Sequence, residues 1–104
     1  MALNKPAPSS DGHHGTAVQI HERLQVLDPV ELRITDDSAH HAGHAGALTG
    51  GGHYHVRIVS QRFANLNKVA RHRLIYTTLA DLMGSAIHAL AIEASTPEES
   101  LTAR

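Results

Sequence analysis

The sequence predicts one α+β domain with the element order α-β-β-α-β-α, a three-stranded mixed sheet and helices on one face. The first observation is length, because 104 residues can enclose only one modest core. The second is a set of segments in which apolar residues recur either at every second position or at steps of three and four. The third is connectivity. The last two strands are joined through a helix, which favours a right-handed parallel crossover, whereas the first two can pair as antiparallel neighbours.

The first helix follows a segment that has no apolar period. Residues 1–15 are rich in proline, serine and glycine, so we predict a mobile tail there. Thr16 and Gln19 fit a capping box, and Asp28 with Pro29 ends the helical pattern. The apolar positions of this helix are Ala17, Ile20, Leu24 and Leu27.

The first two strands are predicted from alternation. Residues 30–35 alternate apolar with polar side chains, and residues 53–60 do the same. The predicted buried face of the second strand consists of Tyr54, Val56 and Ile58. Its opposite face carries His53, His55 and Arg57. Residues 39–52 between the strands are rich in glycine, alanine and histidine, and a loop of this length inside a small domain is usually functional or disordered.

The second half of the chain predicts two more helices and the third strand. Residues 67–83 form a helix that Gly84 ends, and residues 87–94 form the strand. The apolar stripe of that helix is predicted to be Val69, His72, Tyr76, Leu79 and Met83. Thr96 and Pro97 then begin a short terminal helix with an acidic first turn. The domain therefore spans residues 16–100, and residues 101–104 are predicted to be flexible.

Composition excludes several classes of function. Nine basic and ten acidic residues give a formal net charge of −1, so no global field attracts a polyanion. No apolar run approaches the ~20 residues of a membrane span, and the N-terminus lacks a signal-peptide core, so we expect a soluble cytoplasmic protein without a membrane partner. The absence of cysteine excludes disulfides and thiolate nucleophiles. No triad, phosphate loop or carboxylate pair is recognisable, and we predict no enzymatic activity.

Histidine is the residue in excess, with ten in the chain. Four lie in or beside the long loop: His40, His41, His44 and His53. The residues alone allow two interpretations: solvated side chains without a role, or imidazoles that bind zinc, copper or nickel adventitiously. His88 is two and four residues from Leu90 and Ile92, so its side chain is expected on the same face of the strand. From the residues alone it is predicted to pack at the edge of the core. His72 is equally compatible with a core-edge position and with a functional role.

Four segments together resemble the BolA family over residues 17–98: DSAHHAGHAG (37–46), VSQRF (59–63), VARHRLIY (69–76) and IHALA (87–91). The resemblance implies a fold like that of type II KH domains and a bridging [2Fe-2S] cluster shared with a monothiol glutaredoxin and glutathione. It assigns the ligands supplied by this chain to His44 and His88, with His41 and His53 as alternatives to His44. Asn65 stands where the family usually has glycine, and asparagine tolerates the left-handed conformation that such a turn needs.

Some members of that family are regarded as DNA-binding regulators of cell shape and stress responses, which gives the alternative function. The compact basic cluster of this chain would contact DNA or a partner: Arg62, Lys68, Arg71 and Arg73. The GxxG loop with which KH domains clamp nucleic acid is not evident. DNA binding therefore ranks second, and the isolated chain is expected to be a monomer or a weak homodimer.

Overall fold

The structure is a computed structural model that describes residues 12–37 and 52–102. Its elements are α1 (Gly12–Leu24), η1 (Gln25–Leu27), β1 (Glu31–Asp36), β2 (Gly52–Val59), η4 (Gln61–Phe63), α2 (Lys68–Thr78), β3 (Ile87–Ser95) and α3 (Pro97–Thr102). The two η elements are single 3-10 turns. This order confirms the predicted α-β-β-α-β-α arrangement.

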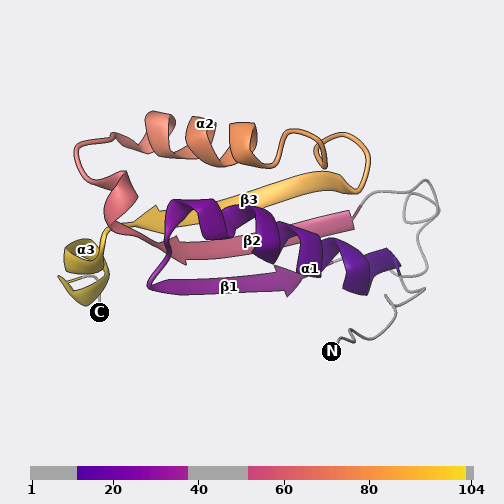
Figure 1. The fold of residues 1–104 in the computed structure, drawn as a ribbon, viewed down its shortest axis with the longest axis horizontal. Coiled ribbons are helices and arrows are strands. Elements are labelled where there is room, and N and C mark those ends of the chain that lie inside the picture. Colours follow the sequence, from indigo (N-terminus) through magenta and orange to yellow (C-terminus); the bar gives the residue numbers. More distant parts are fainter. Residues whose placement is uncertain (1–11, 38–51, 103–104) are drawn as a thin grey trace, which may run out of the picture.

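The three strands form one mixed sheet with the order β1-β2-β3. β1 runs antiparallel to β2, and β2 runs parallel to β3, as the connections predicted. Figure 1 shows the three strands side by side, with α1 and α2 running along the sheet and α3 at the end where β3 finishes. Because β2 and β3 are parallel, both begin at the same end of the sheet.

The core lies between the sheet and the helices α1 and α2. The predicted buried face of β2 is confirmed, since Tyr54, Val56 and Ile58 are 2% exposed or less. Further side chains from α1, η4, α2 and β3 complete this core: Ile20, Leu24, Phe63, Ile75, Leu79 and Ile87. On the opposite face the side chains of His53, His55 and Arg57 are half-buried. The helices therefore cover one face and leave polar groups on the other.

The first helix begins earlier than predicted. It starts at Gly12, so residues 12–15 belong to the helix and not to a tail, and the prediction that Thr16 caps it is wrong. Thr16 lies one turn inside α1 and is 8% exposed, so packing overrides the local capping signal. Residues 1–11 lie outside the described part of the chain.

The terminal helix confirms its predicted cap. The Glu99 backbone N–H donates to Thr96 Oγ1 at 3.2 Å, and the Thr96 backbone N–H donates to Glu99 Oε1 at 2.9 Å. These reciprocal bonds form a capping box, which satisfies two N–H groups at the start of the helix. α3 extends through Thr102, two residues past the predicted end of the domain at residue 100.

The buried stripe of α2 differs from the prediction. Ile75 and Leu79 are fully buried, whereas Val69 is 63% and Tyr76 41% exposed. The physical reason is Arg71, whose side chain is only 12% exposed and lies one turn before Ile75 on the buried side. An arginine can cover a core with its aliphatic stem while its charged end is paired. A prediction based only on the apolar residues of α2 therefore identified the wrong face of the helix.

The boundaries of α2 are set by local geometry. Asn67 caps the helix, since its side-chain oxygen accepts a hydrogen bond from the Ala70 N–H at 2.8 Å. The helix ends at Thr78 and not at Met83, and turns lead on through Gly84, which has a φ of 82°. Asn65 has a φ of 68°, which confirms the left-handed conformation predicted for that turn.

Candidate metal site at the start of strands β2 and β3

Two histidines meet at the end of the sheet where β2 and β3 begin. The rings of His53 and His88 are stacked, with centroids 5.3 Å apart and planes inclined by 26°. His88 is exposed and His53 is half-buried, so ring edges at this position remain open to solvent. Both residues were predicted from the sequence as metal ligands, His53 as an alternative, and the structure brings these two together.

A β-bulge creates this pairing. Gly52 pairs with Ile87, whereas His53 pairs with Ala89, so His88 is the extra residue on β3. The extra residue shifts the alternation of side chains between the two faces of β3. His88 is therefore exposed and does not pack at the edge of the core beside Leu90. The core-edge interpretation of His88 is therefore wrong. Alternation of residue types carries no signal of a bulge, and no feature of the sequence indicated this one.

Farther along the same face, polar side chains form a charge network. His55 Nε2 lies 3.3 Å from Glu93 Oε2, and Arg57 donates to Glu31 at 3.0 Å and to Glu93 at 3.3 Å. Its hydrogen bond to Glu31 raises the pKa of the Arg57 guanidinium above its usual value. His55 therefore has an acidic partner of its own, and it is set apart from the stacked pair.

The described residues do not supply a full set of metal ligands. Within residues 12–37 and 52–102, no group of three or more His, Cys, Asp or Glu side chains is placed to hold a metal ion. His41 and His44, the two predicted loop ligands, lie outside the described residues. The stacked pair can thus contribute imidazole nitrogens to a site whose other ligands come from elsewhere.

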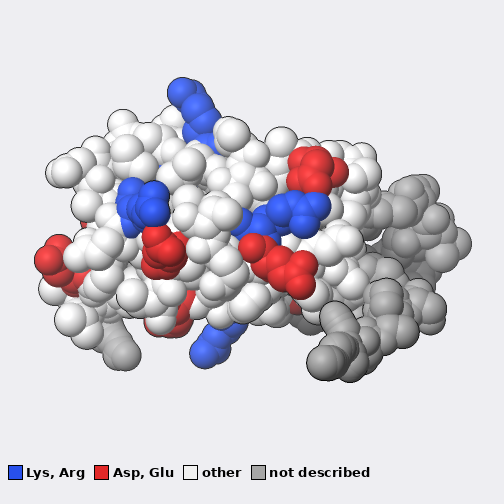
Figure 2. Space-filling view, viewed as in Figure 1, with Lys and Arg blue, Asp and Glu red and all other residues white. Residues whose placement is uncertain are grey.

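The predicted basic cluster is only partly available to a ligand. Arg62 is paired with Asp28 at 2.7 Å, and Arg71 with Glu99 at 2.6 Å. Arg71 also donates to the backbone carbonyls of Leu66 and Ala94, so its role is to connect elements. On the face in Figure 2, several blue groups lie against red ones, and no extended region of one sign is visible. Among the four predicted basic residues, Lys68 and Arg73 have no ion pair within the described part of the chain.

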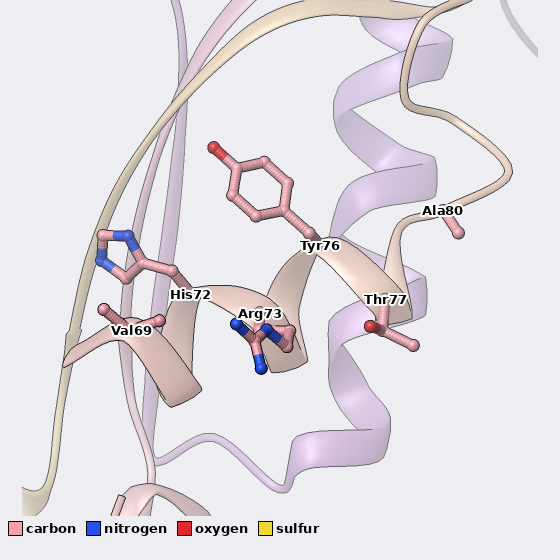
Figure 3. A pocket seen from close by; sticks show the side chains of 6 residues that line it. All are labelled: Val69, His72, Arg73, Tyr76, Thr77 and Ala80. Atoms are coloured by element: carbon pink, nitrogen blue, oxygen red, sulfur yellow. The ribbon is translucent and has the colours of Figure 1, made fainter. Parts of the chain in front are cut away.

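A hollow of about 600 Å³ lies on the outer side of α2. It is lined by Val69, His72, Arg73, Tyr76, Thr77 and Ala80 (Figure 3). All of these residues come from one helix and the turn after it, so the hollow is open to solvent and not enclosed between elements. His72 is half-buried on the flank of α2, on the core side of the sheet, whereas His53 lies on the opposite face.

No helix in the two described segments has the length and apolarity needed to cross a bilayer.

Known proteins resemble this chain in sequence and in structure. The chloroplastic BOLA1 protein of Arabidopsis thaliana is 41% identical over 103 residues, which cover 95% of this chain and 64% of that protein. The DNA-binding transcriptional regulator BolA of Vibrio cholerae is 44% identical over 73 residues, covering 70% and 66%. The chain thus spans less than two thirds of the length of either relative.

The solved BolA domain of SufE1 from Arabidopsis thaliana superposes with a TM-score of 0.72 at 45% identity, covering 89% of this chain and 99% of that one. The model of the family described as BolA-like protein matches residues 24–99, which include β1, β2, α2 and β3 together with both stacked histidines. This chain therefore belongs to the BolA-like protein family.

Proposed function

We propose that this chain is an adaptor that supplies imidazole ligands to a [2Fe-2S] cluster held jointly with a monothiol glutaredoxin and glutathione. The observation that supports it is the stacked pair of His53 and His88, which places two imidazoles side by side at one end of the sheet. Membership of the BolA-like family supports it further, since the resemblance implied this cofactor and this partner.

The donor set of the chain fits such a shared site. The sequence contains no cysteine, so it cannot provide the four thiolates that usually hold an iron–sulfur cluster. Two histidines can replace two cysteines on one iron, as in Rieske centres. The described residues offer two adjacent imidazoles and no larger ligand group, which is the contribution expected from one half of a jointly held site.

We assign the ligand positions to His88 and His44, with His53 as the neighbour that contacts the His88 ring and orients it. His44 precedes β2 in the sequence, and β2 begins at Gly52, at the end of the sheet where His88 lies. His53 and His41 are the alternative second ligands. A bound cluster with imidazole ligation would have a higher reduction potential than an all-thiolate one.

The test is reconstitution of this chain with a monothiol glutaredoxin, glutathione, iron and sulfide, followed by visible circular dichroism. The wild-type mixture is expected to give a spectrum different from that of the glutaredoxin's own cluster. His88→Ala and His44→Ala are each expected to abolish this spectrum, whereas His53→Ala is expected to alter it and retain the complex.

His72→Ala is the matched control, because His72 lines the hollow on α2 and does not contact the stacked pair. This substitution is expected to leave the spectrum unchanged. Loss of the spectrum in His53→Ala and its retention in His44→Ala would transfer the ligand role to His53. A mixture that shows only the spectrum of the glutaredoxin alone would contradict the proposal.

DNA binding is the second candidate. The observation that favours it is that Lys68 and Arg73 on α2 have no ion pair among the residues that the structure describes. The Vibrio cholerae relative carries the name of a DNA-binding regulator. A complex held by phosphate contacts weakens steeply as salt rises, whereas the cluster-bridged complex depends on iron, sulfide and glutathione. Titration of duplex DNA at two salt concentrations therefore separates the two functions.

The proposed role is one of binding without enzymatic turnover, in the cytoplasm. The absence of turnover and the cytoplasmic location both stay predictions. The name of the Arabidopsis relative places that protein in the chloroplast, so fractionation of cells that express this chain is the direct measurement of its location.

A further inference from the structure

The free edge of β3 is a surface that the proposed cluster site does not explain. β3 is the last strand of the sheet. Within the described residues its outer edge has an isolated bridge from Ile87 to Met83, and the rest of the strand pairs only with β2. An edge strand presents backbone N–H and C=O groups that are ready to pair with another strand. Proteins usually protect such edges with lysine, proline or a covering element, and the nine residues of β3, IHALAIEAS, contain neither lysine nor proline.

The direction of the backbone groups identifies which residues are open. The Ser60 N–H donates to the Ser95 carbonyl, so Ser95 faces β2. The carbonyl of Ala94, by contrast, accepts from Arg71 and points to the outer edge. Because successive residues of a strand alternate between its two edges, Leu90 and Ile92 also point their backbone groups outward. Arg71 thus closes one end of the edge. The Gly84 N–H, which donates to the Ile87 carbonyl at 2.9 Å, closes the other end, so the open part is the centre of the strand around Leu90 and Ile92.

We infer that this edge pairs with β3 of a second copy of the chain, antiparallel about a twofold axis at Ala91, which makes one continuous six-stranded sheet. In that register Leu90 of one copy lies opposite Ile92 of the other, and their outward backbone groups form the hydrogen-bonded pairs. Both side chains lie on the core face and are only partly buried within one copy, so the second copy would cover them.

The side chains on the other face are compatible with the same register. Ala89, Ala91 and Glu93 are exposed there. Ala91 meets its own counterpart at the axis, and Glu93 lies opposite the small Ala89 of the other copy, so no like charges face each other. The net charge of −1 adds little repulsion between copies. This self-complementarity selects a second copy as the occupant.

The expected dimer is weak, and sedimentation velocity of the full chain up to about 1 mM measures its dissociation constant. Ala91→Lys places two cations at the axis and is expected to weaken the dimer about tenfold or more. Thr35→Lys, at an exposed position on the opposite edge strand, is the matched control and is expected to have no effect. Mixing Ala91→Lys with Ala91→Glu is expected to restore association as a heterodimer.

Cysteine cross-linking tests the register without depending on a charge substitution. The chain has no cysteine of its own. Ala91→Cys would place two cysteines about 4.5 Å apart between Cα atoms, which lies within the roughly 4.4–6.8 Å that a disulfide spans. It is expected to form dimers under mild oxidation much faster than Thr35→Cys.

Four results would overturn the inference. A wild-type chain that stays monomeric at every concentration would do so, as would a dimer that Ala91→Lys leaves intact. Equal cross-linking of Ala91→Cys and Thr35→Cys would indicate random collision. Hydrogen-exchange protection of β3 that appears only with the glutaredoxin would assign the edge to another protein's strand, and the second copy would be the wrong occupant.

Discussion

Ser60 is a buried side chain that joins three segments. It is fully buried at the end of β2, its hydroxyl donates to the Leu27 carbonyl, and it accepts from the Arg62 N–H at 3.0 Å. Replacement by alanine leaves a backbone donor and acceptor without these partners, and we expect Ser60→Ala to lower the free energy of unfolding by about 1–3 kcal/mol. Urea unfolding measures this. Ser85→Ala, at an exposed serine, should stay within about 0.5 kcal/mol of wild type.

Asn65 adopts a conformation that few residues tolerate. With a φ of 68° it is left-handed, so Asn65→Ala is expected to cost about 1 kcal/mol. Asn65→Gly should be close to neutral, because glycine has no Cβ to clash in this region. Thermal unfolding of the two variants measures the difference. Equal melting temperatures for alanine and glycine would show that backbone strain does not control this turn.

At the scale of elements, Arg71 connects α2 to β3 and α3. Its guanidinium bonds to Leu66, Ala94 and Glu99 and lies 5.9 Å from the centre of the Phe63 ring. Truncation in Arg71→Ala removes these contacts together, and we expect a loss of about 2 kcal/mol or more in unfolding free energy. Arg73→Ala, on the exposed side of the same helix, is the control and should change stability little.

The same contact makes stability depend on acid. The hydrogen bond from Arg71, with that from the Thr96 backbone, lowers the pKa of Glu99 from 4.5 to about 2. A carboxyl whose pKa is lower in the folded state stabilises the fold above its unfolded pKa, and this contribution is lost as pH falls from 4.5 towards 2. Glu99→Gln should therefore be less stable than wild type at neutral pH, with a difference that shrinks through that range. A difference that is independent of pH would contradict this assignment.

Most elements could be predicted because their signals are local. Alternation identified the two faces of β2, and Thr96 with Glu99 marked the start of α3. The errors arose where tertiary contacts override local pattern. Arg71 lies on the buried side of α2 because Glu99 and two carbonyls from other segments bind its charge, and His88 is turned outward by a bulge that alternation does not reveal.

At the scale of the whole molecule, the site could be predicted only in part. Family resemblance selected His88, and the residues alone left it as a core-edge histidine. Its contact with His53 depends on the register between two strands that are separated in the sequence by α2. No single-segment pattern encodes that register. The ligand assignment of His44 stays a prediction, because it lies outside the described residues.

The surface charge of the molecule leads to a prediction for nucleic acid. Arg62 and Arg71 already have acidic partners. Of the four predicted basic residues, only Lys68 and Arg73 are without an ion pair in the described part of the chain and therefore available to neutralise phosphates. Any DNA binding through α2 should show a slope of log affinity against log salt of about −2, since each neutralised phosphate contributes about −0.9. A steeper slope, of −5 or beyond by the same relation, would indicate a larger basic surface than the described residues provide.

The measurement that tests the central claim most directly is pulsed electron paramagnetic resonance of the reduced cluster, with this chain labelled with ¹⁵N and the glutaredoxin unlabelled. Imidazole ligands from this chain would give strong ¹⁵N couplings, and those couplings would be lost in His88→Ala. A cluster spectrum with no strongly coupled ¹⁵N, or with couplings that persist in His88→Ala, would contradict the proposal that this chain ligates the cluster through His88.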